Sequence, residues 1–495
     1  MTAPTAPDRP LLERVRTLIH DARTSYASDL GTSGVLRALA SRLDEPLRVA
    51  LAGRVKSGKS TLLNALVGEP LAAADTGECT RFVTWYRHGV VYRTLVQPRG
   101  GEPLSVPFRR AADRIEPSLD GFDPDGIERL VVEWPSPVLA STTFIDTPGL
   151  GSLTASLGER TTGFLVPERA ISPADAVVYL TRHFHAHDVR FLEAFRDDDA
   201  GRPDPINAVA VLARADEVGA GRIEAMETAE RVAERYRRDP QVRRLCQTVV
   251  PVAGLLALGA ALLSEDDFGA FRRLAAADAQ AIEAVIVSTD RFGGREIDVG
   301  VPLEVRARLL DRYGIFGVRL ARELVRTGAV HSARELALEL RRRSGIERLG
   351  DVLASQFAAR AGVLKARGAL AALGHLLRTS PPPDGGGLAA RLEEVAAGAH
   401  ELAEHRVLLA LRVGALDLRD DETAEIEELF ERAGTRPAAR LGLEDHADRA
   451  VVTEEIVTRV KRWHRRAEHP LAPPLTVDAA RVLARSYEGM LLELE

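Results

Sequence analysis

The sequence predicts a mostly parallel α/β domain followed by a long α-helical region. Between residues 46 and 252 the apolar residues fall into short runs bounded by Gly and Pro, a pattern typical of buried strands in a parallel sheet. After Leu263 such runs almost vanish, and Leu, Ala, Arg and Glu recur at helical spacing nearly to the end. Aromatic residues make up only 5% of the chain, so an all-β fold is not expected.

Five apolar runs are expected to form the core strands. They are Leu47–Leu51, Thr142–Ile145, Ala176–Leu180, Ile206–Leu212 and Val249–Val252. The last run continues into an uncharged stretch that ends at Leu263. At about 15 residues this stretch is shorter than the roughly 20 that a membrane-spanning helix needs, so we interpret it as a strand that leads into a helix.

Residues 11–43 precede the sheet and carry the pattern of an amphipathic helix. Their apolar residues recur at helical spacing with charged residues between them, at Leu12, Val15, Leu18, Ile19 and Ala22. We expect this segment to pack with the helical region. The sequence thus predicts three units: an N-terminal helix at 1–43, an α/β domain at 44–265, and a helical neck and stalk at 266–495.

The helical region is interrupted where Pro and Gly cluster, and these breaks are expected to separate long antiparallel helices. The break at 379–387 has the sequence TSPPPDGGG and lies between helical stretches of similar length. It would then form the tip of a stalk, flanked by groups suited to a lipid interface, at Leu376, Leu377, Arg378 and Leu388. The alternative is a solvated connection between two helices.

Composition disfavours several classes of protein. The 66 basic and 72 acidic residues give a net charge of -6, so we expect no binding to nucleic acid. Cys79 and Cys246 are the only cysteines, too few for a disulfide framework and typical of a reducing cytoplasm. The N-terminus lacks the basic-then-apolar order of a signal peptide, so export is not expected.

A Gly-rich segment connects the first predicted strand to a predicted helix. Its spacing, G-x-x-x-x-G-K-S, in that strand-to-helix context is typical of a phosphate-binding loop, whose backbone N–H groups converge on phosphates. Lys59 is expected to reach the β- and γ-phosphates, and the Ser60 hydroxyl to bind Mg²⁺. The predicted nucleotide-binding residues of this loop are Gly53, Lys56, Ser57, Gly58, Lys59, Ser60 and Thr61.

The motif Asp146-Thr147-Pro148-Gly149 directly follows the second predicted strand. Asp146 would face the phosphate loop and hold Mg²⁺ through a water molecule, and the Gly149 N–H would bond the γ-phosphate. Loss of that phosphate would release the segment, which is the behaviour of a switch. Alone, the motif could be an ordinary turn. In a chain with a phosphate loop it indicates a nucleoside triphosphatase.

Asp216 ends the segment Ala213-Arg214-Ala215-Asp216, which stands where GTPases have N/T-K-x-D. A carboxylate accepts hydrogen bonds from the guanine N1–H and exocyclic amine, a pairing that adenine cannot offer. Asp216 therefore indicates GTP rather than ATP. Ala213 lacks the usual polar side chain, and Arg214 replaces Lys, although the Arg214 stem and planar head could still lie along the base. The alternative is a solvated aspartate at a strand end.

Two further residues are expected to complete the site. Thr80 lies in a polar loop before the strand-like run at 82–86 and would complete the Mg²⁺ shell; a structural threonine is the alternative. Ala253 follows the last predicted strand and would support the base edge through its backbone. The expected ligands are therefore GTP or GDP and Mg²⁺, with the metal held by Ser60, Thr80 and, through water, Asp146.

Together these features resemble the bacterial dynamin-like GTPases, most of all an actinobacterial group. The resemblance spans the chain and includes the stretches LRVALAGRVKSGKSTLLNALVGE and TGECTRFVTWYRHG, DTPG with an apolar next residue, and the helical tail. It implies a cytoplasmic GTPase, peripheral to the inner face of the plasma membrane, with a stalk that contacts lipid. It also implies pairing of nucleotide domains, as a homodimer or as a heteromer with a dynamin-like paralogue. The catalytic residues would be Lys56, Lys59, Thr80 and Gly149.

The phosphate loop departs from this family at Val55-Lys56, where dynamins have Gln-Ser and the serine helps to bind a monovalent cation. We hypothesise that the Lys56 ammonium itself supplies positive charge to the β–γ bridging oxygen. Two of only four lysines lie in this loop, which favours a need for compact point charges. A solvated loop lysine is the alternative.

Two functions fit these features. The first is a GTPase that drives self-assembly and the remodelling or repair of the cytoplasmic membrane. Because Leu150 stands where small GTPases place a glutamine, its intrinsic turnover is expected to be slow and raised by assembly. The second is a GTP-binding scaffold with weak or no hydrolysis that pairs with an active paralogue, which the incomplete base-reading motif and the missing Gln-Ser favour.

Overall fold

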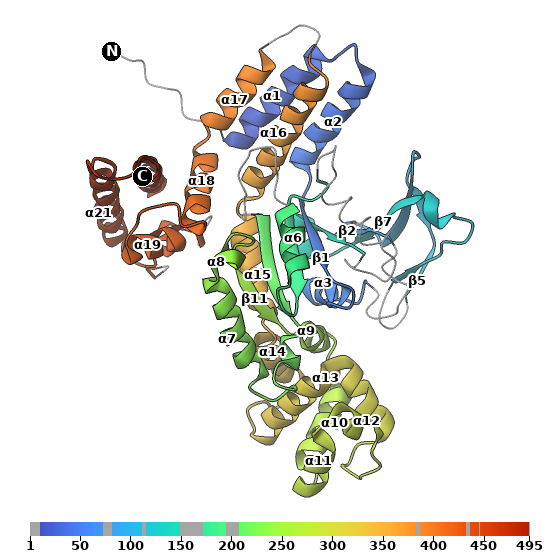
Figure 1. Ribbon diagram of the computed structural model, residues 1–495. Coiled ribbons are helices and arrows are strands. Elements are labelled where there is room, and N and C mark those ends of the chain that lie inside the picture. Colours follow the sequence, from blue (N-terminus) through green and yellow to red (C-terminus); the bar gives the residue numbers. More distant parts are fainter. Residues whose placement is uncertain are drawn as a thin grey trace.

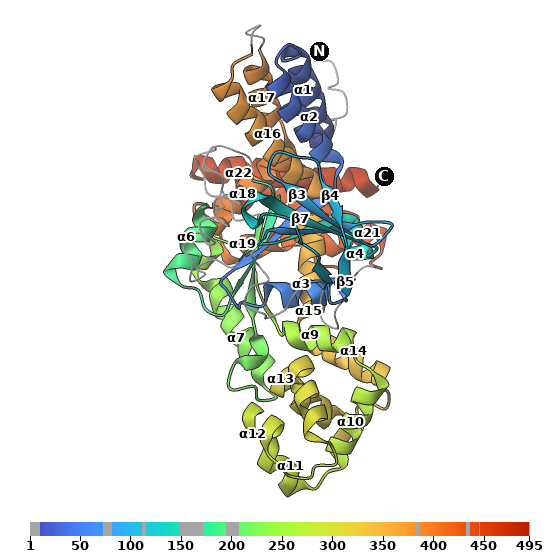
Figure 2. The ribbon, with the colours of Figure 1, turned by 90° about the vertical axis from the view of Figure 1, so that its right-hand side faces the viewer.

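The computed structural model describes residues 10–72, 82–110, 115–148, 172–194, 207–382, 387–431, 436–444 and 446–494. A mostly parallel sheet lies at the centre, and helical clusters extend from it in three directions (Figure 1). Figure 2 shows that two of these clusters lie at opposite ends of an elongated molecule. The predicted fold class, an α/β domain with a long helical region, is confirmed.

The central sheet has nine strands in the order β11-β10-β9-β1-β8-β2-β7-β3-β4. The five strands from β11 to β8 are mutually parallel, and antiparallel pairings occur where β2 meets β8 and where β3 meets β7 and β4. The strands are β1 (Leu47–Gly53), β2 (Thr84–His88), β3 (Arg93–Pro98), β4 (Leu104–Val106), β7 (Ile127–Trp134), β8 (Thr142–Asp146), β9 (Ala176–Thr181), β10 (Ala208–Ala213) and β11 (Val249–Val252). A separate hairpin pairs β5 (Phe108–Arg110) with β6 (Ile115–Pro117).

Helices cover both faces of the parallel strands, because successive side chains of each strand point to opposite faces. Val49 and Leu51 of β1 pack with α3 and α15, whereas Ala50 and Ala52 pack with the α6, α7 and α8 side. The helices next to the sheet are α3 (Lys59–Val67), α4 (Pro137–Ser141), α6 (Ala186–Ala194), α7 (Ala225–Arg238), α8 (Pro240–Arg243), α9 (Gly254–Ala261) and α15 (Ile346–Val352). As predicted, the uncharged stretch after Val249 is a strand, β11, that leads into a helix, α9.

One helical cluster lies below the sheet in Figure 1, and we call it the lower lobe. Asp267 of α10 holds it together from a fully buried position, because its carboxylate accepts hydrogen bonds from Arg312 Nη1 at 2.7 Å and from the Tyr313 hydroxyl at 3.0 Å. The helices of the lobe are α10 (Glu265–Ala276), α11 (Ala279–Ile286), α12 (Thr289–Gly294), α13 (Leu303–Arg326) and α14 (Ala333–Arg343).

The second cluster, at the opposite end, brings the N-terminal segment against the helical region. It contains α1 (Leu11–Ser25), α2 (Leu30–Asp44), α16 (Ala361–Thr379) and α17 (Leu388–Ala397). The N-terminal segment forms two helices rather than one, because Asp29 caps a new helix by accepting from the Thr32 N–H. No helix in the described ranges is long and apolar enough to cross a membrane.

The side chains beside the 379–387 break differ from the prediction. Leu377 and Leu388 are only 9% and 2% exposed, and Leu376 packs against the same apolar cluster. The prediction that these leucines face a lipid interface is therefore wrong, because α1 and α2 supply the apolar surface that covers them. Part of the break lies outside the described residues.

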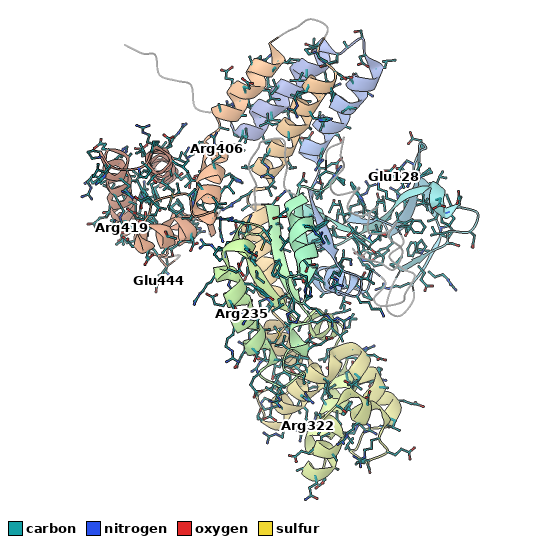
Figure 3. The ribbon with its side chains drawn as sticks, in the orientation of Figure 1. Glu128, Arg235, Arg322, Arg406, Arg419 and Glu444 are labelled. Atoms are coloured by element: carbon teal, nitrogen blue, oxygen red, sulfur yellow. The ribbon has the colours of Figure 1, made fainter. Side chains whose placement is uncertain are left out.

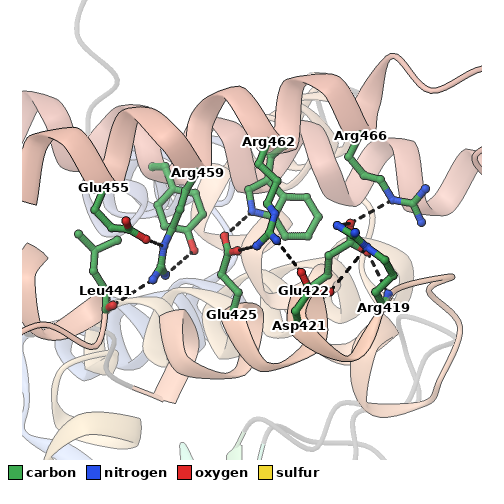
Figure 4. Close-up of polar contacts among 11 residues, drawn as sticks. Arg419, Asp421, Glu422, Glu425, Leu441, Glu455, Arg459, Arg462 and Arg466 are labelled. Carbon is green, nitrogen blue, oxygen red and sulfur yellow. Dashed lines mark hydrogen bonds and ion pairs between the residues drawn. The ribbon is translucent and has the colours of Figure 1, made fainter.

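The third cluster is a C-terminal bundle whose apolar core is continuous with one face of the sheet. Trp463 is fully buried in it and donates from Nε1 to Glu425 Oε1 at 2.7 Å, while Arg462 pairs with Glu425 and Asp421 (Figure 4). Arginines of α21 thereby bind the acidic face of α19. The helices are α18 (His400–Arg412), α19 (Asp420–Glu431), α20 (Pro437–Arg440), α21 (Arg449–Ala467) and α22 (Pro474–Leu494).

Candidate nucleotide site

The phosphate loop runs from the end of β1 to the start of α3 and requires glycine at two positions. Gly53 has φ 146°, and a Cβ there would lie 2.3 Å from the Leu180 carbonyl oxygen. Gly58 has φ 91° and is the N-cap of α3. The loop therefore lies against the end of β9, with the first N–H groups of α3 at its open side, as anion binding requires.

Lys59 is buried within this loop, at 6% exposure. Its Nζ donates to the carbonyl oxygens of Gly53 and Arg54, both at 3.2 Å. Burial lowers the pKa of the ammonium, and the nearby Asp146 carboxylate opposes that shift. A buried cation beside the N-terminus of a helix is well placed to bind a phosphate, because a phosphate would supply the negative charge that a buried ammonium needs as a partner.

Ser60, the second residue of α3, meets Asp146 at the carboxyl end of β8. Ser60 Oγ donates to Asp146 Oδ2 at 2.9 Å. Asp146 is 3% exposed, and within the described residues its buried Oδ1 has no hydrogen-bond partner. Burial raises the pKa of this carboxyl, whereas Lys59 and Ser60 act to lower it. One hydroxyl and a carboxylate oxygen in need of a partner fit a hydrated Mg²⁺, which prefers oxygen ligands and retains several waters.

The segment predicted to read the base follows β10. Asp216 lies in a short turn at Ala215–Glu217, is 9% exposed, and has its pKa raised to about 6, chiefly by burial. Arg214 has φ 53°, and its Nη1 donates to Glu217 Oε1 at 2.9 Å. In this arrangement the Arg214 guanidinium is directed to Glu217.

Ala253, the residue that follows β11, is fully buried. Its N–H donates to the Ser344 carbonyl oxygen at 2.9 Å, in the turn after α14. That amide is therefore engaged within the protein in this arrangement, and a base contact from this turn would have to come from other backbone atoms. The lower lobe thus reaches the predicted base side of the site through the turn that follows α14.

Lys56 projects from the phosphate loop with φ 61°, a left-handed conformation that is uncommon for a residue with a side chain. It is exposed, and its ammonium has no ion-pair partner in the described part of the chain. Thr80 and Gly149, the other two predicted catalytic residues, lie outside the described ranges.

A basic cavity of about 470 Å³ adjoins the phosphate loop, and no motif in the sequence predicted it. Its side chains come from the loop after β1 and from the turn after β9. These two segments lie side by side because β1 and β9 are parallel neighbours and end at the same edge of the sheet. The lining includes Arg54, Lys56, Arg182, His183 and His185. The clustering of Arg and His after a buried strand was the only sequence signal for it.

Comparison with known proteins shows to which family the chain belongs. The profile of the dynamin family matches residues 49–202. The isoniazid-induced protein IniC of Mycobacterium tuberculosis is 40% identical over 487 residues, which cover 97% of this chain and 98% of IniC. The chain belongs to the dynamin family. Proteins of the dynamin family are GTPases, and the matched segment contains both the phosphate loop and Asp146.

Two further proteins match over shorter segments, and a solved structure matches at low sequence identity. The isoniazid-induced protein IniA of Mycobacterium tuberculosis is 31% identical over 187 residues, covering 36% of this chain and 28% of IniA. A bacterial dynamin-like protein of Nostoc punctiforme is 31% identical over 120 residues, covering 22% of this chain and 17% of its own. A solved structure of an oligomerised bacterial dynamin pair covers 98% of this chain and 74% of its own at 12% identity, with a TM-score of 0.31.

Proposed function

We propose that this chain binds GTP with Mg²⁺ and hydrolyses it to GDP and phosphate. The observation that carries the proposal is the hydrogen bond between Ser60 and Asp146, because a hydroxyl and a carboxylate beside the buried Lys59 ammonium are candidate Mg²⁺ ligands. This combination of a loop cation and a paired hydroxyl and carboxylate matches the chemistry that nucleoside triphosphates require. Asp216, on the other side of β1, favours guanine.

Each residue has a distinct proposed task. The backbone N–H groups from Ser57 to Thr61 and the Lys59 ammonium would bind and orient the phosphates. Ser60 and, through water, Asp146 would hold Mg²⁺, which when bound neutralises charge on the β- and γ-phosphate oxygens. Thr80 and Gly149 are proposed to complete the metal shell and to bond the γ-phosphate.

We extend the proposal to work at a membrane. The chain would assemble through its nucleotide domains at the inner face of the plasma membrane, as a homodimer or with a dynamin-like paralogue. One organism carries both IniC and IniA, and both resemble this chain, which supports a paralogous partner. The units 1–43, 44–265 and 266–495 would then serve as N-terminal helix, motor and stalk.

Hydrolysis by the purified chain tests the enzymatic part. GTP turnover should exceed ATP turnover, should rise with protein concentration and with anionic liposomes, and should be lost in Lys59→Ala. Equal hydrolysis of GTP and ATP would contradict guanine recognition. Binding of GTP without hydrolysis in a single-turnover experiment would favour the scaffold function, which the exposed Lys56 in place of a dynamin serine also motivates.

Liposome flotation tests the proposed membrane-facing tip. Replacing residues 381–386 with a short Gly-Ser linker should reduce binding to anionic liposomes. The turn between α21 and α22 provides a comparison, because Leu471 there is 87% exposed. If Leu471→Ser abolishes flotation and the linker variant does not, the 379–387 segment is not the lipid contact.

A further inference from the structure

The turn that follows Asp216 has an unusual backbone. Gly219, Ala220 and Gly221 have φ values of 66°, 62° and 65°, so three successive residues are left-handed. Ala220 carries a Cβ and adopts this conformation rarely, which means that surrounding contacts must hold the turn. We name residues 218–221 the base-side turn.

Arg319 of α13 makes those contacts. Its Nη1 donates to the carbonyl oxygens of Ala220 at 3.0 Å and Gly221 at 2.5 Å. Its Nε and Nη2 donate to the Ile286 carbonyl oxygen at 3.0 and 2.9 Å, and Nη2 also reaches the Val287 carbonyl oxygen at 2.7 Å. The guanidinium therefore links the base-side turn to the end of α11, and the five bonds use its fixed planar geometry.

The same helix also approaches Asp216 directly. α13 is kinked at Gly314, which has φ 65°, and a Cβ at that position would lie 3.7 Å from Asp216 Oδ2. Gly221 also lies close to α13, because a Cβ there would lie 3.0 Å from Ile315 Cγ2. The kink and the Arg319 bonds together fix the segment that carries the base-reading carboxylate.

Close backbone packing holds α13 in this position. A Cβ at Gly259 of α9 would lie 2.6 Å from the Arg312 carbonyl oxygen, so the two helices meet without intervening side chains. α9 begins directly after Ala253, at the other base-side strand end. α13 thus contacts the segments that follow both β10 and β11 and links them to the lower lobe.

We propose that Arg319 is a positioning residue for guanine recognition, which it performs by holding the base-side turn. The inference rests on the proposed function, because it assumes that Asp216 reads the base. It adds that the lower lobe is energetically coupled to base binding: a base that orders Asp216 also orders the turn, Arg319 and the end of α11. Such coupling acts in both directions.

Arg322 provides a matched control. It lies one turn further along α13, is labelled in the lower lobe in Figure 3, and is half-buried like Arg319. Burial lowers the pKa of both guanidinium groups. Arg322 Nε donates to the Leu274 carbonyl oxygen at 3.2 Å, within the lobe, and makes no hydrogen bond to the base-side turn. Arg322→Met therefore removes a comparable side chain from the same helix.

The test uses the full chain, fluorescently labelled GDP, and unlabelled GDP and IDP as competitors. IDP lacks the exocyclic amine that Asp216 would bind, so the ratio of the two affinities reports the carboxylate contact. Arg319→Met should lower the preference for GDP over IDP by about 3- to 10-fold, and Arg319→Lys by less. Arg322→Met should leave the ratio unchanged. Partial unfolding lowers both affinities together and does not change the ratio.

Amide hydrogen exchange gives a second readout. In the wild type, GDP should slow exchange in the base-side turn and at 284–288, and in Arg319→Met this effect should be lost at 284–288. An unchanged affinity ratio in a folded Arg319→Met protein would overturn this inference and leave the proposed function standing. A wild type that binds GDP and IDP equally, or binds neither, would overturn base reading by Asp216 and with it this inference.

Discussion

Ser60 Oγ lies 2.9 Å from Asp146 Oδ2, although 86 residues separate them in the sequence. The parallel pairing of β1 with β8 creates this contact, because it aligns Leu51 with Asp146 at the carboxyl edge of the sheet. Thr147 reinforces it by donating from Oγ1 to the Leu51 carbonyl oxygen at 2.9 Å. The proposed metal site therefore depends on strand register as much as on the phosphate loop.

Asp146→Asn should weaken Mg²⁺ binding while preserving the shape of the site. The amide keeps one oxygen but removes the charge that would attract metal-bound water, so the Mg²⁺ concentration for half-maximal GTP hydrolysis should rise by about 10- to 100-fold. A Mg²⁺ titration of the hydrolysis rate measures this change. Glu128→Gln, remote from the site on β7, is the control and should match the wild type.

Nucleotide affinity should depend on pH through Asp216. Because burial raises the pKa of this carboxyl to about 6, the ionised form that would accept hydrogen bonds from guanine is lost as the pH falls through 6. GDP affinity should then decrease by up to about 10-fold per pH unit below 6. Titrations of labelled GDP between pH 5 and 8 test this. Asp216→Asn should bind more weakly at pH 7.5 and show a flatter profile.

The raised pKa of Asp216 also predicts an effect on the free energy of unfolding. The pKa of Asp216 in the folded protein is higher than the ordinary value of 3.8, so the folded protein loses stability as the pH rises from about 4 to about 6. Asp216→Asn avoids this loss and should raise the free energy of unfolding at pH 7 by ~1–3 kcal/mol. Urea denaturation without nucleotide at pH 4.5 and 7 measures it; an equal effect at both pH values would contradict the assigned cause.

Lys56 can be tested without disturbing its unusual backbone. Asn tolerates φ near 60° better than most residues, so Lys56→Asn removes the charge while the loop keeps its shape. We expect about a 10-fold or greater fall in kcat, with Lys56→Arg closer to the wild type. The wild-type rate should not require potassium. Normal hydrolysis by Lys56→Asn, together with a potassium requirement in the wild type, would show that Lys56 is only a solvated loop residue.

The lower lobe should depend on Asp267. Asp267→Ala leaves the buried Tyr313 hydroxyl without its acceptor and should destabilise the lobe by about 1–3 kcal/mol. Limited proteolysis should then cleave first between residues 265 and 343. Asp266→Ala is the control, because this neighbouring side chain is exposed. Equal sensitivity of the two variants would contradict a central role for Asp267.

Several features could be predicted because they are local. The phosphate loop is a backbone conformation that Gly53 and Gly58 permit, and the core strands are apolar runs that remain recognisable in any register. β7 was missed because Glu128, Arg129 and Glu133 interrupt its apolar pattern. The burial of Glu133, which is only 7% exposed, is explained by strand pairing alone. Pairing brings Arg87 and Arg93 of the neighbouring strands into ion pairs with its carboxylate.

The sequence by itself determined the fold class, the phosphate loop and the candidates Asp146 and Asp216, because each depends on residue type and short spacing. Only the tertiary structure decided which groups meet. It buried Leu377 against the N-terminal helices, engaged the Ala253 N–H with Ser344, and placed Arg319 on the base-side turn. These contacts join segments that are distant along the chain, and their energies depend on packing that no local pattern specifies.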